Sequence, residues 1–208
     1  MATLQIHSVA SPFDSPSVAS LAVTVLTRAE AMGLLPPTET IERLDMAMFR
    51  RLAGGIAEAG IGNGVLAGLS ATPRPSAQQL AGTLRRLNEA LDASPRPVSE
   101  WRGVHDVLGG DVLAQLLGIS ASSLRRYHSG SRTTPDEIAA RLHFLALVIG
   151  DLAGAYNDFG VRRWFQRPRK LLGSRSPAQL LSGTWRPEDP DPRRVRDLAA
   201  ALVFSPAT

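Results

Sequence analysis

Hydrophobic residues recur at helical spacing along most of this chain, and glycine or proline separates one such stretch from the next. The clearest stripe predicts an amphipathic helix over residues 76–93 and consists of Leu80, Leu84, Leu87 and Leu91. The same spacing predicts helices over 17–32, over 98–108 and from about 136 to 156. Alanine and leucine are abundant and β-branched runs are few, so the sequence predicts an all-α fold.

Residues 1–97 are expected to form a helical region of unassigned role, bounded by a proline-rich corner. Residues 4–6 are β-prone, and we expect at most an ordered arm there. A second helix is expected to begin near Thr38, with the apolar set Ile41, Leu44, Met48, Leu52 and Ile56. Four glycines between Gly60 and Gly68 predict a bend or a mobile loop.

Residues 111–132 predict two short helices joined by a tight turn. Gly118 is expected to end the first helix, because glycine adopts the left-handed backbone without a Cβ clash. Ser120 is expected to cap the second, since its hydroxyl can accept a bond from a free amide. Leu124 and Tyr127, three residues apart, are expected to point inward. This pattern is typical of a helix-turn-helix, whose second helix enters a DNA major groove.

The second helix supplies the candidate contacts to double-stranded DNA. They are Ser120, Ala121, Ser122, Ser123, Arg125, Arg126 and Arg132. Arginines read guanine edges or grip phosphates, and serine hydroxyls bond base edges or the backbone, so both roles stay open. Arg132 is expected to contact phosphate, and the alternative is a helical hairpin with solvated arginines. Because one such unit reads few bases, we expect a homodimer on a two-fold site.

The distribution of charge favours nucleic acid as a partner. Of the 23 basic residues, 22 are arginines, and Lys170 is the single lysine. Residues 1–100 carry 8 arginines against 9 acidic residues, a balance of −1. Residues 101–208 carry 15 basic against 10 acidic residues, a balance of +5. The positive charge therefore belongs to the half that contains the helix-turn-helix pattern.

Other functional classes find little support in the composition. The chain has no cysteine, which excludes disulfides, thiol catalysis and cysteine-based metal sites. The four histidines have no metal-ligand spacing, and the glycine-rich stretch lacks the ending of a phosphate loop. We therefore expect no enzyme, metal or cofactor. The longest apolar run, 142–155, is too short and polar to span a bilayer, and we expect a cytoplasmic protein without a signal peptide or membrane contact.

Residues 158–183 contain a second motif with regular punctuation. A tryptophan–phenylalanine pair lies on a short helix that Pro168 stops, and Ser176 with Pro177 starts the next helix. The candidate partner-binding residues are Arg162, Arg163, Trp164, Phe165, Arg167, Arg169 and Lys170. The five cations suit an acidic protein surface or DNA phosphates. The alternative is the solvated face of a small helical subdomain.

These two motifs together resemble a known family. The stretch LAQLLGISASSLRRYHSGSR resembles the Xre-type helix-turn-helix, and residues 158–183 look like the toxin-binding domain of the Xre/MbcA/ParS antitoxins. The second likeness rests on the spacing of Trp164, Phe165, Pro168, Leu171, Gly173, Ser176, Pro177, Leu180 and Leu181. It departs from the family pattern in a Pro/Asp-rich loop at 187–192 and in the whole of residues 1–97.

The resemblance implies a helix-turn-helix domain over 98–157 and a toxin-binding-like domain over 158–208. It implies an antitoxin that binds DNA at its own promoter and a cognate toxin, with RES-type toxins, which consume NAD, as the common partners. One alternative is a stand-alone transcriptional regulator that uses residues 1–97 for dimerisation or ligand sensing. A scaffold protein is the third class, and salt-dependent DNA affinity separates it from the other two.

Overall fold

The computed structural model describes residues 5–35 and 40–203, and within these ranges it confirms an all-α fold. The N-terminal elements are β1 (Gln5–Ile6), α1 (Pro16–Ala31), β2 (Thr40–Ile41), α2 (Met46–Glu58), α3 (Asn63–Ala71) and α4 (Ala77–Asp92). The later elements are α5 (Pro97–Leu108), α6 (Gly110–Leu117), α7 (Ala121–His128), α8 (Asp136–Ala153), α9 (Asp158–Gln166), the 3-10 turn η1 (Lys170–Leu172), α10 (Pro177–Leu180) and α11 (Pro190–Val203).

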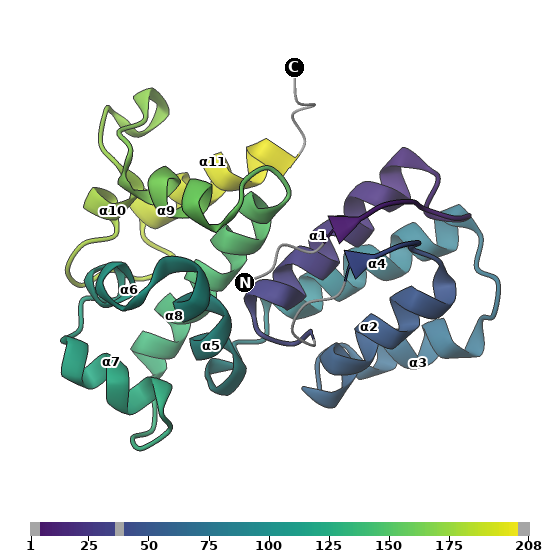
Figure 1. The fold of residues 1–208 in the computed structure, drawn as a ribbon, viewed down its shortest axis with the longest axis horizontal. Coiled ribbons are helices and arrows are strands. Elements are labelled where there is room, and N and C mark those ends of the chain that lie inside the picture. Colours follow the sequence, from purple (N-terminus) through teal and green to yellow (C-terminus); the bar gives the residue numbers. More distant parts are fainter. Residues whose placement is uncertain (1–4, 36–39, 204–208) are drawn as a thin grey trace.

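The helices form two neighbouring groups, α1–α4 and α5–α11 (Figure 1). Helix α8 is the centre of the second group, and every residue from Arg141 to Leu152 is buried. Helix α1 lies against both α4 and α8 and so joins the groups. Its Arg28 donates from Nε to Asp151 Oδ1 at 2.9 Å, a largely buried ion pair that links α1 to α8. Burial raises the pKa of Asp151, and the Arg28 charge opposes that rise.

The predicted start of the second helix is wrong, because Ile41 and Leu44 both precede α2. Ile41 does not belong to a helix, because β2 pairs in parallel with β1, with Ile6 opposite Ile41. Helix α2 starts later, where Asp45 caps it by accepting from the Met48 amide at 2.9 Å. Thr38 and Leu4 lie outside the described residues.

Of the two alternatives for the glycine-rich stretch, the bend is confirmed at Gly60 and Gly62 and the mobile loop is wrong, because residues 63–71 form α3. Gly60 and Gly62 make the turn before it, with φ of +76° and +62°. Leu66 and Leu69 are buried, so packing against α2 and α4 holds this helix despite its two internal glycines.

Close packing of α8 on α1 makes Gly150 a sensitive position. A Cβ at Gly150 would lie 2.7 Å from the Arg28 Cα, whereas a Cβ at Gly82 of α4 would meet nothing within 4 Å. Gly150→Ala should lower the free energy of unfolding by about 1–3 kcal/mol through overpacking. Gly82→Ala, the matched control, should raise it by about 0.5–1 kcal/mol through backbone entropy. Denaturant unfolding measures both, and equal effects from the two substitutions would contradict this packing.

Candidate nucleic-acid interface

Helices α6 and α7 are two short helices joined by a tight turn, as the sequence predicts for residues 111–132. Gly118 ends α6 in the left-handed region with φ of +67°, and a Cβ there would lie 2.6 Å from the Gly183 carbonyl oxygen. Ser120 caps α7, and its hydroxyl accepts from the Ser123 amide at 3.1 Å. The turn is thus determined by one glycine, one serine cap and the close approach of a distant loop.

The inner face of α7 is anchored by two buried side chains. Leu124 is 3% exposed and Tyr127 is 7% exposed, which confirms that both point inward. The Tyr127 ring stacks on Trp101 of α5 with centroids 5.9 Å apart. The Arg132 guanidinium lies over the Tyr127 ring, 5.5 Å from its centroid. Arg132, in the turn after α7, is therefore exposed but lies against the Tyr127 ring.

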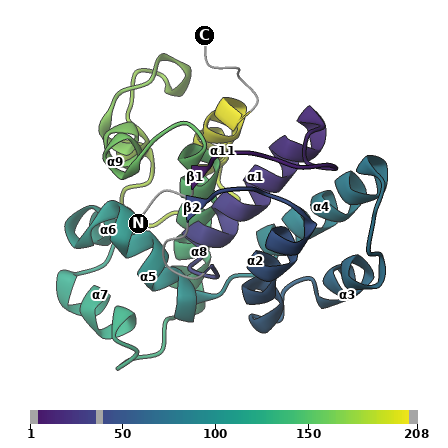
Figure 2. The same ribbon diagram turned by 45° about the vertical axis from the view of Figure 1, so that its right-hand side comes forward.

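The outer face of α7 is polar and cationic. Four side chains line a shallow hollow on it, namely Ser122, Arg125, Arg126 and Ser129. All four residues are exposed, as are Ser120, Ala121 and Arg132. Figures 1 and 2 both place α7 at an edge of the molecule, far from α2 and α3, so no described element covers this face.

The serines at the start of α7 differ in exposure. The Ser120 hydroxyl accepts from the Ser123 amide at 3.1 Å and lies within hydrogen-bond distance of the Ser123 and Ser122 hydroxyls, at 3.1 and 3.0 Å. Ser123 is also half-buried, so the hydroxyls of Ser120 and Ser123 serve mainly the start of the helix. Ser122 lies on the outer face beside Arg125 and Arg126. Ser122 is therefore better placed than Ser123 to reach a partner.

A buried clamp holds the end of α6 in place. The last carbonyls of a helix lack partners within the helix. Here Trp185 Nε1 donates to the Leu116 carbonyl at 2.9 Å, and Arg141 Nη1 donates to the Leu117 carbonyl at 2.9 Å. Arg141 Nε also donates to the Trp185 carbonyl at 2.7 Å, so the loop after α10 is tied to the helix-turn-helix. Neither residue was predicted as part of this unit, since both contacts span long sequence distances.

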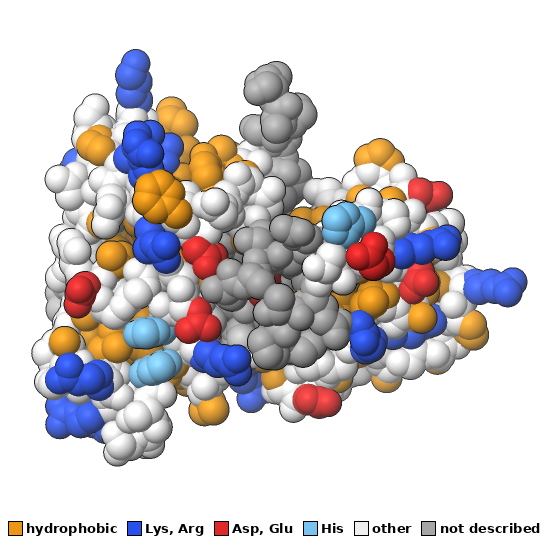
Figure 3. Space-filling model, in the orientation of Figure 1, with side chains coloured by type: hydrophobic (Ala, Val, Ile, Leu, Met, Phe, Trp, Pro, Cys, Tyr) orange, Lys and Arg blue, Asp and Glu red, His pale blue; other side chains and the backbone are white. Residues whose placement is uncertain are grey.

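A histidine pair flanks the outer face of α7. The rings of His105 and His128 stack with centroids 4.6 Å apart, and Figure 3 shows two histidines side by side next to arginine side chains. Partial burial, and then the His105 ring, lower the pKa of His128 below its ordinary value, while Asp106 opposes this shift. The folded chain thus binds fewer protons at this site than the unfolded chain just below pH 6.5, and stability falls there as pH falls.

A proton NMR titration of the His128 ring should therefore give a pKa below that of an exposed histidine. His105→Ala should move this pKa upward, because one of its two causes is removed. The control is His7→Ala, at a residue that follows β1, which should leave the pKa of His128 unchanged. An unchanged His128 titration in the variant would contradict the proposed coupling of the two rings.

The second motif separates into buried and exposed residues. Trp164 and Phe165 of α9 are 1% and 0% exposed and pack edge to face, with centroids 5.3 Å apart. A direct role in partner binding is therefore wrong for these two, since their apolar area forms the core between α9 and its neighbours. Arg162 donates to the Val107 carbonyl of α5 at 2.6 Å, and the Arg169 guanidinium lies 5.3 Å from the Trp164 centroid. Both arginines therefore make contacts within the fold, which limits their availability to a partner.

Two exposed apolar residues accompany the remaining cations. Phe159 is 64% exposed and Leu171 is 75% exposed. Arg163, Arg167 and Lys170 are exposed on the same segment, and Figure 3 shows hydrophobic and basic side chains side by side over α9. Phe159 was not predicted to lie on the surface, because an aromatic residue at the start of a helix is typical of a core position.

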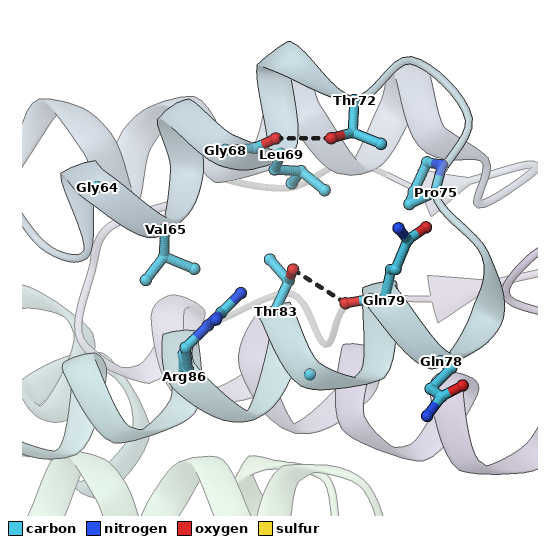
Figure 4. Close-up of a pocket in the computed structure, with 11 residues that line it drawn as sticks. Gly64, Val65, Gly68, Leu69, Thr72, Pro75, Gln78, Gln79, Thr83 and Arg86 are labelled. Atoms are coloured by element: carbon cyan, nitrogen blue, oxygen red, sulfur yellow. Dashed lines mark hydrogen bonds between the residues drawn. The ribbon is translucent and has the colours of Figure 1, made fainter.

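A separate hollow of about 650 Å³ lies between α3 and α4. Figure 4 shows Val65 and Thr83 facing each other across it, whereas Gln78 points away. The hydroxyls of Thr72 and Thr83 donate to carbonyls of their own helices, at 3.1 and 3.0 Å. The lining thus brings together no set of titratable groups, and we assign no chemistry to this hollow.

No group of three or more His, Asp or Glu residues within 5–35 and 40–203 could hold a metal ion. In the same ranges no single helix is long and apolar enough to cross a membrane; α8 and α9 reach that limit only jointly, across a 118° bend. No protein-family model, curated protein or solved structure matches the chain. The antitoxin resemblance stays a prediction.

Proposed function

We propose that this protein is a DNA-binding transcriptional regulator that presents α7 to the major groove. The observation that carries the proposal is the division of α7 into two faces. Leu124 and Tyr127 hold the helix from inside, while Ser122, Arg125 and Arg126 remain exposed outside. An exposed helix with paired arginines is the kind of element that reads guanine edges in the major groove.

The surroundings of α7 support the same proposal. Arg132 is exposed in the turn after α7, with its guanidinium over the Tyr127 ring, and we expect it to meet phosphate when the helix lies in the groove. Residues 101–208 carry the excess of positive charge, with 15 basic against 10 acidic residues. A positive half attracts DNA without regard to sequence, and the α7 side chains then supply the discrimination.

The experiment is a selection from a pool of randomised duplexes, followed by a salt titration on the enriched sequence. We expect a defined motif to be enriched. The logarithm of affinity should fall by about 0.9 per phosphate contact for each logarithmic unit of salt, and therefore by at least about 0.9 per chain from Arg132. Failure to enrich any sequence, together with weak binding that occurs only at low salt, would contradict a sequence-specific role.

The second candidate function adds a protein partner, as the antitoxin resemblance implies. The specific observation is the pair Phe159 and Leu171, which stays exposed beside Arg163, Arg167 and Lys170. Exposed apolar side chains on a segment rich in exposed cations suit an acidic protein surface with an apolar centre. A toxin of the RES type is the proposed partner.

Co-expression with a toxin encoded beside this chain tests the second candidate. The parent should form a complex, and Phe159→Asp should abolish it while leaving DNA binding intact. Val98→Asp, at a residue 97% exposed on α5, is the matched control and should retain the complex. An intact complex with the Phe159 variant would contradict this surface, and no complex with the parent would favour a stand-alone regulator.

A further inference from the structure

A buried histidine lies where α4, α5 and α8 meet. His143 of α8 is 7% exposed, and its Nδ1 lies 2.6 Å from Glu100 Oε1 of α5. Its Nε2 lies 2.9 Å from the backbone carbonyl of Asp92, the last residue of α4. Glu100 is fully buried. One imidazole thus bridges residues 1–97 and the two helices that support α7.

These two contacts determine how many protons the site needs. The Asp92 carbonyl only accepts, so Nε2 must carry a hydrogen for that contact to be a hydrogen bond. A carboxylate also only accepts, so the Nδ1–Glu100 contact needs a second proton, on either His143 or Glu100. A neutral imidazole facing an ionised carboxylate has one proton for two contacts. The contact that lacks the proton is then a repulsion between two lone pairs.

The charges around the bridge agree with this count. Arg196 of α11 donates to Asp92 Oδ1 at 2.6 Å, and Arg28 of α1 pairs with Asp151 further along α8. The ionisable groups facing this junction are Arg28, Asp92, Glu100, His143, Asp151 and Arg196, from five helices. The Arg28–Asp151 and Arg196–Asp92 pairs are each neutral, so the buried pair of His143 and Glu100 is neutral only when it holds the additional proton. Charge balance matters here because unpaired charge is costly when buried.

We propose that His143 and Glu100 form a proton-dependent tether between the N-terminal helical region and the DNA-binding unit. With the proton present, His143 holds the end of α4 and Glu100 at the same time. When the proton is lost, the bond to the charged carboxylate is the stronger of the two and is kept. The bond to the Asp92 carbonyl is then the one that breaks. Loss of this proton therefore frees the end of α4 from His143 while α1 stays packed on α8, a regulation that does not depend on what α7 binds.

The sign of the effect follows from proton linkage. The folded chain keeps a proton that an unfolded histidine loses near pH 6.5. Because the folded state then binds more protons than the unfolded state, stability falls as pH rises above that value. One retained proton makes the unfolding equilibrium constant rise about tenfold per pH unit over that window.

The test compares the parent with Glu100→Gln in denaturant unfolding from pH 6 to pH 9. A glutamine amide can donate to a bare Nδ1, so neutral His143 then satisfies both contacts without an additional proton. We expect the tenfold-per-unit slope in the parent and a flat profile in the variant. Glu137→Gln removes a carboxylate from the exposed start of α8 and is the matched control, with the parental slope expected.

Nitrogen-15 NMR of the parent supplies a second measurement that needs no variant to fold. Above pH 7 it should show hydrogen on Nε2 of His143 and a shared proton at Nδ1. Equal slopes in the parent and the Glu100 variant would overturn the proposal. So would a His143 ring that loses its second proton near pH 6.5, as exposed histidines do.

Discussion

Replacing Arg125 and Arg126 together by alanine should remove most of the sequence-specific DNA affinity and leave the fold intact. Both side chains lie on the outer face of α7 and are exposed. Neither contributes to the inner face, where Leu124 and Tyr127 make the packing contacts. A bidentate arginine–guanine pair discriminates by about 1–3 kcal/mol, so two such pairs correspond to a weakening of roughly 100-fold or more.

The chain contains a matched control for this variant. Arg85 and Arg86 are another adjacent, exposed pair, on α4 in the N-terminal group. Alanine at both positions removes the same charge and should weaken binding only slightly. Fluorescence anisotropy on the selected duplex measures affinity, and a thermal melt checks the fold. Equal losses in the two double variants would reduce the role of α7 to general electrostatics.

Trp185→Ala should be among the most destabilising single substitutions in the chain. The indole packs edge to face on Phe144 at 5.1 Å, lies 5.7 Å from the Arg141 guanidinium and donates to the Leu116 carbonyl. Truncating a buried tryptophan costs about 3–5 kcal/mol. The end of α6 also loses the partner of one carbonyl, so DNA affinity should fall together with stability.

A smaller substitution separates packing from hydrogen bonding at this position. Trp185→Phe keeps an aromatic ring but leaves the Leu116 carbonyl unpaired, which should cost about 1–3 kcal/mol. Thr184→Ala, at the exposed neighbouring residue, should be close to neutral. Denaturant unfolding orders the three variants. A Trp185→Ala protein as stable as the Thr184 variant would contradict the clamp.

Local chemistry accounts for most of what the sequence predicted correctly. The turn around Gly118 and Ser120 depends on residues within a few positions of one another, and both roles are confirmed. The helix over residues 76–93 was predicted for the same reason, since its leucine stripe and its Ser76 cap are local. The helix prediction was wrong at Ile41 because its strand partner, Ile6, lies far away in the sequence. Pairing with Ile6 places Ile41 in a strand although its spacing is helical.

Long-range contacts account for the parts that the sequence did not predict. In the sequence, Arg141 and His143 are two polar residues within an otherwise apolar helix. Their structural roles depend on hydrogen bonds to carbonyls and a carboxylate that distant parts of the chain place beside them. Trp164 reads equally well as core or as contact surface, and only its burial decides for core.

Site-directed cleavage of DNA tests the central proposal most directly. The chain has no cysteine, so Ser122→Cys creates a unique thiol on the outer face of α7 for an iron chelate that cleaves nearby DNA. Gln78→Cys on exposed α4 carries the same reagent as a control. We predict cuts confined to a few base pairs inside the selected sequence from position 122, and none there from position 78. Absence of cleavage from position 122, or the same cuts from both positions, would contradict the assignment of α7 as the DNA-reading helix.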